Sequence, residues 1–111
     1  MTNLSYRPLS EINARKFAAI ASKPPSDVFI LDARDVDETK TGMLKGAVNI
    51  PTQDIIYRLN EIPRNKKIII HCKTGTRASM AYETLKQNGY KVEFLNKKIK
   101  IDANGSFKIG S

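Results

Sequence analysis

Cys72 is the residue in this sequence that could carry covalent chemistry. It is the only cysteine among the 111 residues, and it opens the segment Cys-Lys-Thr-Gly-Thr-Arg at 72–77. A short polar loop that contains a glycine can turn several backbone N–H groups toward one anionic atom. Positive charges on Lys73 and Arg77 favour the thiolate, which is the nucleophilic form of a cysteine. An adduct on Cys72 must be discharged by an outside nucleophile, because the chain has no second thiol.

The cysteine loop follows a predicted buried strand and precedes a predicted amphipathic helix. Residues 67–71 form a short segment rich in isoleucine, which is typical of a strand buried on both faces of a parallel sheet. Cys72 is therefore expected at the carboxyl end of a strand, the edge where open α/β sheets bind ligands. The helix presents its positive end to the sulfur and ends near Gly89. Its predicted buried stripe consists of Ala78, Ala81, Tyr82 and Leu85.

Two further helices are predicted from capping residues and apolar spacing. Ser10 is the expected N-cap of the first, with Glu11 at its positive end, and Pro24 ends it. The second runs over 53–60 and stops before Pro63. The positions expected to face the core are Ala14, Phe17, Ala18 and Ala21 in the first helix and Ile55, Ile56 and Leu59 in the second.

Strands are also predicted at 28–31, 47–50 and 92–95, so strands and helices alternate and the fold class is α/β. The C-terminal residues differ, because they alternate apolar and polar side chains on both sides of the turn Asn104-Gly105. We expect a single domain over 1–111, with a core over about 5–96 and a β-hairpin over about 98–109.

The net charge of +8, from 19 basic and 11 acidic residues, favours anionic partners. The basic residues are scattered, with one short cluster at Lys97, Lys98 and Lys100, and no nucleic-acid-binding motif or zinc-ligand spacing is present. We therefore expect small anions or acidic proteins as partners, without nucleic acid, metal or cofactor. No stretch is apolar enough for a membrane span, and residues 1–10 lack the apolar segment of a signal peptide. The expected location is the cytoplasm.

The order of three motifs resembles the rhodanese family over residues 28–95. Leu31-Asp32-Ala33-Arg34 looks like that family's Asp-x-Arg strand end, and Glu38 falls where an acidic residue is common. Residues 42–51, Gly-Met-Leu-Lys-Gly-Ala-Val-Asn-Ile-Pro, are similar to its Gly-His-Ile-x-Gly-Ala-x-Asn-Ile-Pro signature, and 72–77 match its active-site loop. Two differences stand out: Met43 replaces the histidine, and Asn96-Lys97-Lys98 with the hairpin replace a Gly-Gly and a Trp. We expect neither difference to touch the cysteine loop.

The resemblance implies a three-layer α/β domain with a central, mainly parallel sheet flanked by helices. It also implies a sulfurtransferase that moves sulfane sulfur from thiosulfate, polysulfide or a protein persulfide to a thiophilic acceptor such as cyanide or a thiol. By position, Cys72 would carry the sulfur as a persulfide. The loop that surrounds the sulfur and binds its negative charge, called the cradle below, would consist of Lys73, Thr74, Gly75, Thr76 and Arg77.

Other interpretations remain at this point. Cys72 could be an inert core residue, although its loop argues against that. Asp32 and Arg34 could contact substrate or could pair and fix loops. His71 should point to the side opposite Cys72, so we assign it no catalytic role.

Two other functions compete with sulfur transfer. A cysteine-dependent phosphatase resembles His-Cys-x5-Arg, one residue longer than the spacing to Arg77. A sulfur carrier without turnover, or a protein-docking module, would keep the same fold. The intact cysteine argues against docking alone.

Overall fold

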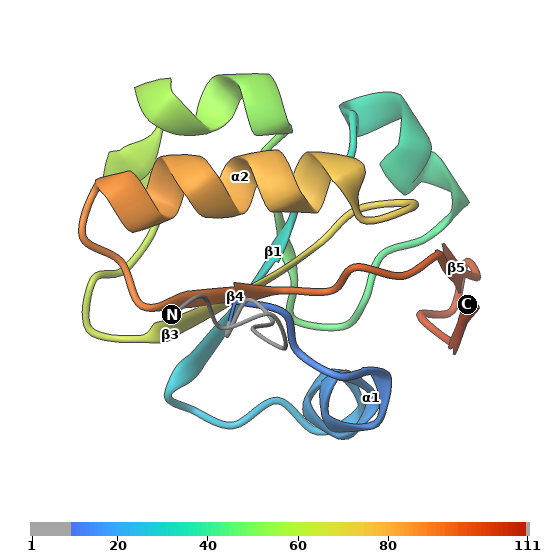
Figure 1. The fold of residues 1–111 in the computed structure, drawn as a ribbon. Helices are drawn as coiled ribbons and strands as arrows, with labels where there is room; N and C mark the ends of the chain where they lie inside the picture. The colour runs from blue at the N-terminus through green and yellow to red at the C-terminus, as the bar shows by residue number, and fades with distance from the viewer. Residues whose placement is uncertain (1–9, 111) are drawn as a thin grey trace, which may run out of the picture.

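The computed structural model describes residues 10–110 and contains a four-stranded parallel sheet (Figure 1). The strands are β1 (Val28–Asp32), β2 (Val48–Asn49), β3 (Lys67–His71) and β4 (Val92–Phe94), in the order β2-β1-β3-β4. All three neighbouring pairs are parallel, which confirms the predicted α/β class. The strand at 67–71 has the predicted bounds, and the one at 47–50 shortens to two residues.

Helices cover both faces of the sheet and make three layers (Figure 1). One face carries α2 (Thr76–Gln87) and the 3₁₀ helices η2 (Thr52–Tyr57) and η3 (Leu59–Glu61), whereas α1 (Ala14–Ser22) lies on the other. The three-layer arrangement is thus confirmed. None of the helices within 10–110 is long and apolar enough to cross a membrane.

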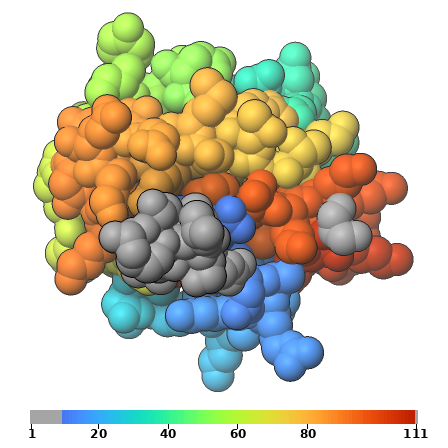
Figure 2. All heavy atoms as spheres, viewed as in Figure 1, coloured from blue at the N-terminus to red at the C-terminus, as the bar shows by residue number. Residues whose placement is uncertain are grey.

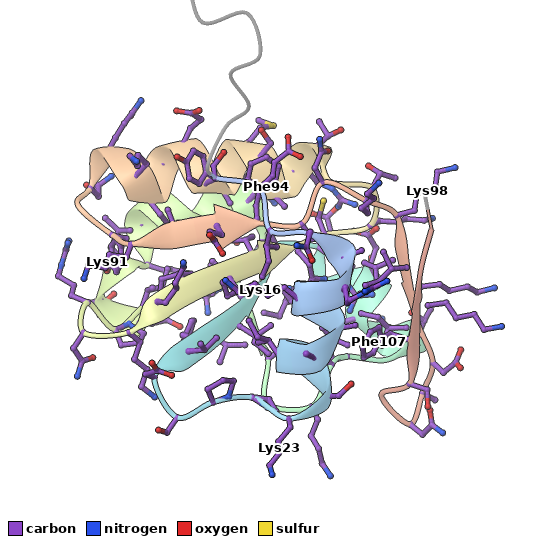
Figure 3. The ribbon with its side chains drawn as sticks, turned by 60° about the horizontal axis from the view of Figure 1, so that its bottom comes forward. Lys16, Lys23, Lys91, Phe94, Lys98 and Phe107 are labelled. Atoms are coloured by element: carbon purple, nitrogen blue, oxygen red, sulfur yellow. The ribbon has the colours of Figure 1, made fainter. Side chains whose placement is uncertain are left out.

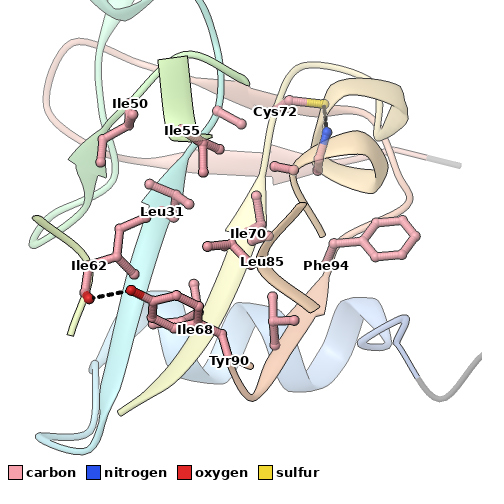
Figure 4. Packing of buried hydrophobic residues seen from close by; sticks show 14 residues of the cluster. Leu31, Ile50, Ile55, Ile62, Ile68, Ile70, Cys72, Leu85, Tyr90 and Phe94 are labelled. Atoms are coloured by element: carbon pink, nitrogen blue, oxygen red, sulfur yellow. Dashed lines mark hydrogen bonds between the residues drawn. The ribbon is translucent and has the colours of Figure 1, made fainter. Parts of the chain in front are cut away.

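Successive residues of β3 face opposite layers, and this alternation sets the side on which the cysteine lies. Ile68 and Ile70 belong to the buried cluster under α2, whereas Ile69 belongs to the cluster on the α1 side. Cys72 continues the first series and lies in the cluster under α2 (Figure 4). Tyr90 closes the far end of this cluster, where its hydroxyl donates to the carbonyl of Ile62 at 2.8 Å.

The predicted start of the first helix is wrong. Asn13 is the N-cap of α1, and its Oδ1 accepts the backbone N–H of Lys16 at 2.7 Å. Residues 10–12 instead extend beside β4: Phe94 N–H donates to the Ser10 carbonyl at 2.7 Å, and Ile12 N–H to the Phe94 carbonyl at 3.0 Å. Ser10 is not the cap, because residues 10–12 pair with the open edge of β4 and the helix begins only at Ala14.

The predicted helix at 53–60 is also wrong in type. The segment forms the two 3₁₀ helices η2 and η3, which have three residues per turn. Ile55 is fully buried, but Ile56 is 49% exposed instead of facing the core. The tighter repeat rotates Ile56 away, because residues three apart share a side in a 3₁₀ helix.

The predicted C-terminal hairpin is confirmed as β5 (Ile99–Ile101) and β6 (Phe107–Ile109), paired antiparallel. Ile99 and Ile101 are buried in the α1-side cluster, which attaches the hairpin to the body of the domain. Gly42 makes the closest approach: a Cβ there would lie 1.9 Å from the carbonyl oxygen of Asp102. Its φ of +140° and ψ of 156° belong to a region open only to glycine.

Gly42→Ala should therefore destabilise the fold more than Gly46→Ala. Both residues have positive φ, but a Cβ on Gly46 would meet nothing closer than a Pro24 carbon at 3.9 Å. We expect a loss of about 1–2 kcal/mol for Gly46→Ala from backbone strain alone. The free energy of unfolding of Gly42→Ala, measured in urea, should fall by at least about 2 kcal/mol more than that of Gly46→Ala. Equal losses for the two variants would contradict the close packing of the hairpin.

Candidate functional site

The pairing of β1 with β3 brings the two predicted chemical segments to one edge of the sheet. Asp32 lies opposite His71 in the register, so the residues that follow the two strands are neighbours. Cys72 comes directly after β3 and is a free thiol with 1% of its surface exposed. The candidate site is therefore at the carboxyl edge of the sheet, as the sequence predicted.

The sulfur of Cys72 accepts two backbone N–H groups. The N–H of Gly75 lies 3.0 Å from Sγ and that of Ala78 lies 3.3 Å away. Figure 4 draws the second of these bonds. Of the predicted cradle residues 73–77, only Gly75 donates to Sγ in the described structure. Ala78 was missed, although it occupies the third position of α2, where backbone N–H groups have no partner within the helix. Its place in the first turn of the predicted helix was the sequence signal that could have identified Ala78 as a donor.

Gly75 is required by the shape of the loop. Its φ is +108°, and a Cβ there would lie 2.7 Å from Oδ1 of Asn96 and 2.9 Å from the Asn96 Cα. The expectation that the C-terminal differences leave the loop untouched is therefore wrong. Asn96 packs on Gly75, and the N–H of Ile99 donates to the carbonyl of Lys73 at 3.0 Å. The C-terminal segment closes over the cysteine loop.

Arg77 is engaged by Glu38, which lies on the 3₁₀ helix η1 (Val36–Thr41). Both guanidinium Nη atoms bond the two carboxylate oxygens, with Nη2 to Oε2 at 2.9 Å. This bond from Arg77 lowers the pKa of Glu38 from 4.5 to about 2, although burial of the carboxylate acts in the opposite direction. The same bond is the largest cause of the raised pKa of Arg77, and the nearby Cys72 adds to it.

Asp32 and Arg34 form a buried ion pair with each other. The Arg34 Nε donates to Oδ1 of Asp32 at 2.9 Å, and Nη2 donates to Oδ2 at 2.7 Å. Arg34 also donates to the carbonyls of Glu38 and Gly42 at 3.3 and 2.8 Å. This geometry favours the interpretation that the pair fixes loops: it ties the end of β1 to the middle of η1, at Glu38, and to the residue that follows η1, Gly42.

His71 lies on the other side of the strand from the sulfur. It is fully buried, and its ring makes an edge contact with Phe17, centroid to centroid 5.9 Å. Burial lowers the pKa of His71, while the carboxylate of Asp32, 4.0 Å from Nε2, opposes this. Within the described residues Nε2 has no hydrogen-bond partner. A neutral, buried ring in this position fits packing rather than proton transfer to Cys72.

Lys73, Thr74 and Thr76 are exposed on the loop around the sulfur. Among residues 10–110, no group of three or more His, Cys, Asp or Glu side chains is placed to hold a metal ion. The sulfur of Cys72 is buried and accepts two backbone N–H groups, so the chemistry that the site offers is that of one shielded, nucleophilic sulfur atom.

Glu38→Gln should lower the free energy of unfolding at pH 7 by about 1–2 kcal/mol, because the ion pair with Arg77 is partly buried. A folded-state pKa of about 2 lies below the ordinary 4.5, so the stabilisation is present above pH 4.5 and is lost as the pH falls toward 2. The gap between wild type and variant should therefore close over that window in urea unfolding. Glu61→Gln, which removes the exposed local pair with Arg58, should have a much smaller effect. A gap that stays constant down to pH 2 would contradict this account.

Comparison with known proteins identifies the family. A rhodanese-like domain matches residues 13–100. The chain is 36% identical over 84 residues to the proposed sulfur carrier protein YrkF of Bacillus subtilis, which covers 74% of this chain and 45% of that protein. It is also 36% identical over 64 residues to a sulfurtransferase of Allochromatium vinosum, covering 58% of this chain and 60% of the relative.

Solved structures agree with this assignment. The crystal structure of a rhodanese-related protein from Thermoplasma volcanium superposes with a TM-score of 0.70 at 26% identity, covering 84% of this chain and 86% of that one. The chain spans about half the length of the curated relatives it matches. On the match to residues 13–100, this chain belongs to the family of rhodanese-like domains.

Proposed function

We propose that this protein transfers sulfane sulfur through a persulfide on Cys72. The observation that carries the proposal is the pair of backbone N–H groups, from Gly75 and Ala78, that converge on Sγ at 3.0 and 3.3 Å. Donors directed at a thiol favour its anionic form and hold the same atom while sulfur is added and removed. The family includes sulfurtransferases and proposed sulfur carriers, which fits this chemistry.

The proposed first half-reaction loads the cysteine. The Cys72 thiolate attacks the outer sulfur of thiosulfate, the S–S bond of thiosulfate breaks, and sulfite leaves with the electron pair. With polysulfide or a protein persulfide as donor, the shortened polysulfide or the donor thiolate leaves instead. The product in each case is Cys72–S–S⁻.

The second half-reaction discharges the persulfide. A nucleophile such as cyanide or a thiolate attacks the outer sulfur, the S–S bond breaks, and the Cys72 thiolate is restored. Within residues 10–110 no acceptor takes the N–H groups of Thr76 and Arg77, which begin α2. These donors, with the exposed ammonium group of Lys73, could stabilise the negative charge on the outer sulfur.

The proposed roles differ among the sequence-predicted residues. Cys72 carries the sulfur, and the loop that follows it forms the cradle, from Lys73 through Thr74, Gly75 and Thr76 to Arg77. Asp32 and Arg34 have an indirect role, because their ion pair holds in place the η1 segment that bears Glu38. Small sulfur anions, and a protein that donates or accepts sulfur, are the proposed partners.

A sulfur carrier that reacts only with its own partner is the second candidate. The observation that favours it is the burial of Cys72, whose surface is 1% exposed. A thiol shielded to this degree would be loaded slowly by free anions if a docked partner had to open the loop. A phosphatase is less consistent with the structure, because the phosphate-binding arginine of such a loop would here be Arg77, which is bound to Glu38.

The mass of the reduced protein tests the persulfide directly. After incubation with thiosulfate or polysulfide, wild type should gain one sulfur atom, and cyanide should remove it. Cys72→Ser should gain nothing, since it lacks the nucleophile. Uptake of a cyanide-labile sulfur by Cys72→Ser would rule out this mechanism. Uptake by wild type from a desulfurase persulfide but from neither anion would identify the carrier.

Arg77→Ala should slow sulfur transfer by about 10- to 1000-fold, because it frees the first turn of α2, and loss of a positioned N–H donor to an anion has an effect of this order. The guanidinium holds the start of α2 against Glu38, so its loss also loosens the donors around the sulfur. Steady-state thiosulfate:cyanide kinetics measure the effect. Arg58→Ala is the matched control, because it breaks an exposed pair with Glu61 away from the loop. Wild-type rates for Arg77→Ala across pH would show that the N–H groups act without this arginine.

A further inference from the structure

A cleft of about 920 Å³ lies beside the cysteine loop. Lys73 and Thr74 of the loop form one side of it, η1 forms another, and both strands of the C-terminal hairpin form the third. Cys72 itself does not line the cleft, but it directly precedes Lys73. Figure 2 shows the red C-terminal segment against the yellow segment before α2, and the bond from Ile99 N–H to the Lys73 carbonyl joins them. The hairpin is thus a wall of the cleft beside the cysteine loop.

The wall formed by the hairpin carries a row of lysines. Lys98, Lys100 and Lys108 are all exposed and all line the cleft. Lys100 lies directly opposite Lys108 in the antiparallel register, and like charges in that position destabilise a hairpin. In the described part of the chain, no carboxylate lies within 4.0 Å of any of the three ammonium groups. An anion bound across them would relieve this repulsion.

The other charged groups of the cleft are already neutralised. Glu38 is bonded to Arg77, and Arg34 is bonded to Asp32. The uncompensated charge therefore comes from Lys73 and the three hairpin lysines, and it is positive throughout. A volume of about 920 Å³ is near the upper end of small-molecule sites, far larger than thiosulfate requires.

We propose that this cleft binds an acidic polypeptide segment of the protein that exchanges sulfur with Cys72. The inference rests on the function proposed above and names the partner for the same site. Lysines are mobile point charges that suit scattered carboxylates. Single-stranded nucleic acid fits less well, because among residues 10–110 no aromatic ring lines the cleft for bases to stack on, and the arginine that lines it there, Arg34, is committed to Asp32.

The transfer step itself is a thiol–persulfide exchange. A cysteine thiolate on the bound segment attacks the outer sulfur of Cys72–S–S⁻, the S–S bond breaks, and the Cys72 thiolate leaves with the electron pair. The segment then carries the persulfide. Loading from such a segment is the same reaction in reverse.

Synthetic acceptor peptides test the proposal. One peptide holds eight glutamates and a terminal cysteine, and its partner holds eight glutamines and the same cysteine. We expect persulfide-loaded wild type to transfer sulfur to the acidic peptide at least about tenfold faster at low salt, because charge complementarity raises the association rate. Dithiothreitol, a small uncharged thiol, serves as the reference acceptor and measures sulfur transfer that does not depend on charge.

Two variants with the same change in net charge locate the effect. The hairpin variant is Lys98→Gln/Lys100→Gln/Lys108→Gln. The control variant is Lys16→Gln/Lys23→Gln/Lys91→Gln, whose three lysines are exposed away from the cleft (Figure 3). The hairpin variant should lose the preference for the acidic peptide, the control should keep it, and the rate with dithiothreitol should be the same in all three proteins.

Binding of the labelled acidic peptide, followed by fluorescence anisotropy, separates this proposal from the proposed function. If Cys72 never takes up sulfur, the proposed function fails, while weaker binding to the hairpin variant than to the control would still support an acidic ligand. Equal binding losses in the two variants would overturn the proposal, because the effect would then be one of net charge. Tighter, hairpin-dependent binding of an octathymidylate strand would also overturn it and identify a nucleic-acid surface.

Discussion

The parallel pairing of β1 with β3 sets the position of each group around the sulfur. The register places Asp32 opposite His71, so the loops after the two strands must leave the sheet side by side. The pleat of β3 then directs Ile70 and Cys72 into the layer under α2. Because Ala78 packs in that same cluster, the first turn of α2 lies over the sulfur and its N–H reaches Sγ. The packing of Ala78 in the core thus also places the N–H group that binds the sulfur of Cys72.

Both arginines near the loop are committed to carboxylates. Arg34 is held by buried Asp32, and Arg77 by Glu38, so neither brings a free positive charge to the sulfur. The groups left to stabilise an anion are backbone N–H dipoles and Lys73. The arginines instead connect β1, η1 and α2, because Arg34 also bonds the carbonyls of Glu38, within η1, and of Gly42, which follows it. Rigid donors lose less free energy to reorganisation than mobile side chains do.

The departures from the family signature gather on one side of the site. Asn96 lies where the family often has a glycine pair, and it packs on Gly75. The hairpin that follows bonds Lys73 through Ile99, and its turn at Gly105 lies against the backbone of Met43. These segments build a basic wall beside the cysteine loop, because Lys98, Lys100 and Lys108 of the hairpin line the cleft there. The C-terminal segment therefore shapes the cleft beside the cysteine loop.

The sequence by itself determined what depends on neighbours along the chain: the strand at 67–71, the polar loop after it, the apolar stripe of α2 and the hairpin turn at Asn104-Gly105. Their signals are periodicity and turn chemistry, which are local. Only the tertiary structure decided what depends on distant segments. Arg77 meets Glu38 across 39 residues, and Ser10 bonds β4 instead of capping α1. Such pairs have no local signal, because only formation of the sheet brings them within hydrogen-bonding distance.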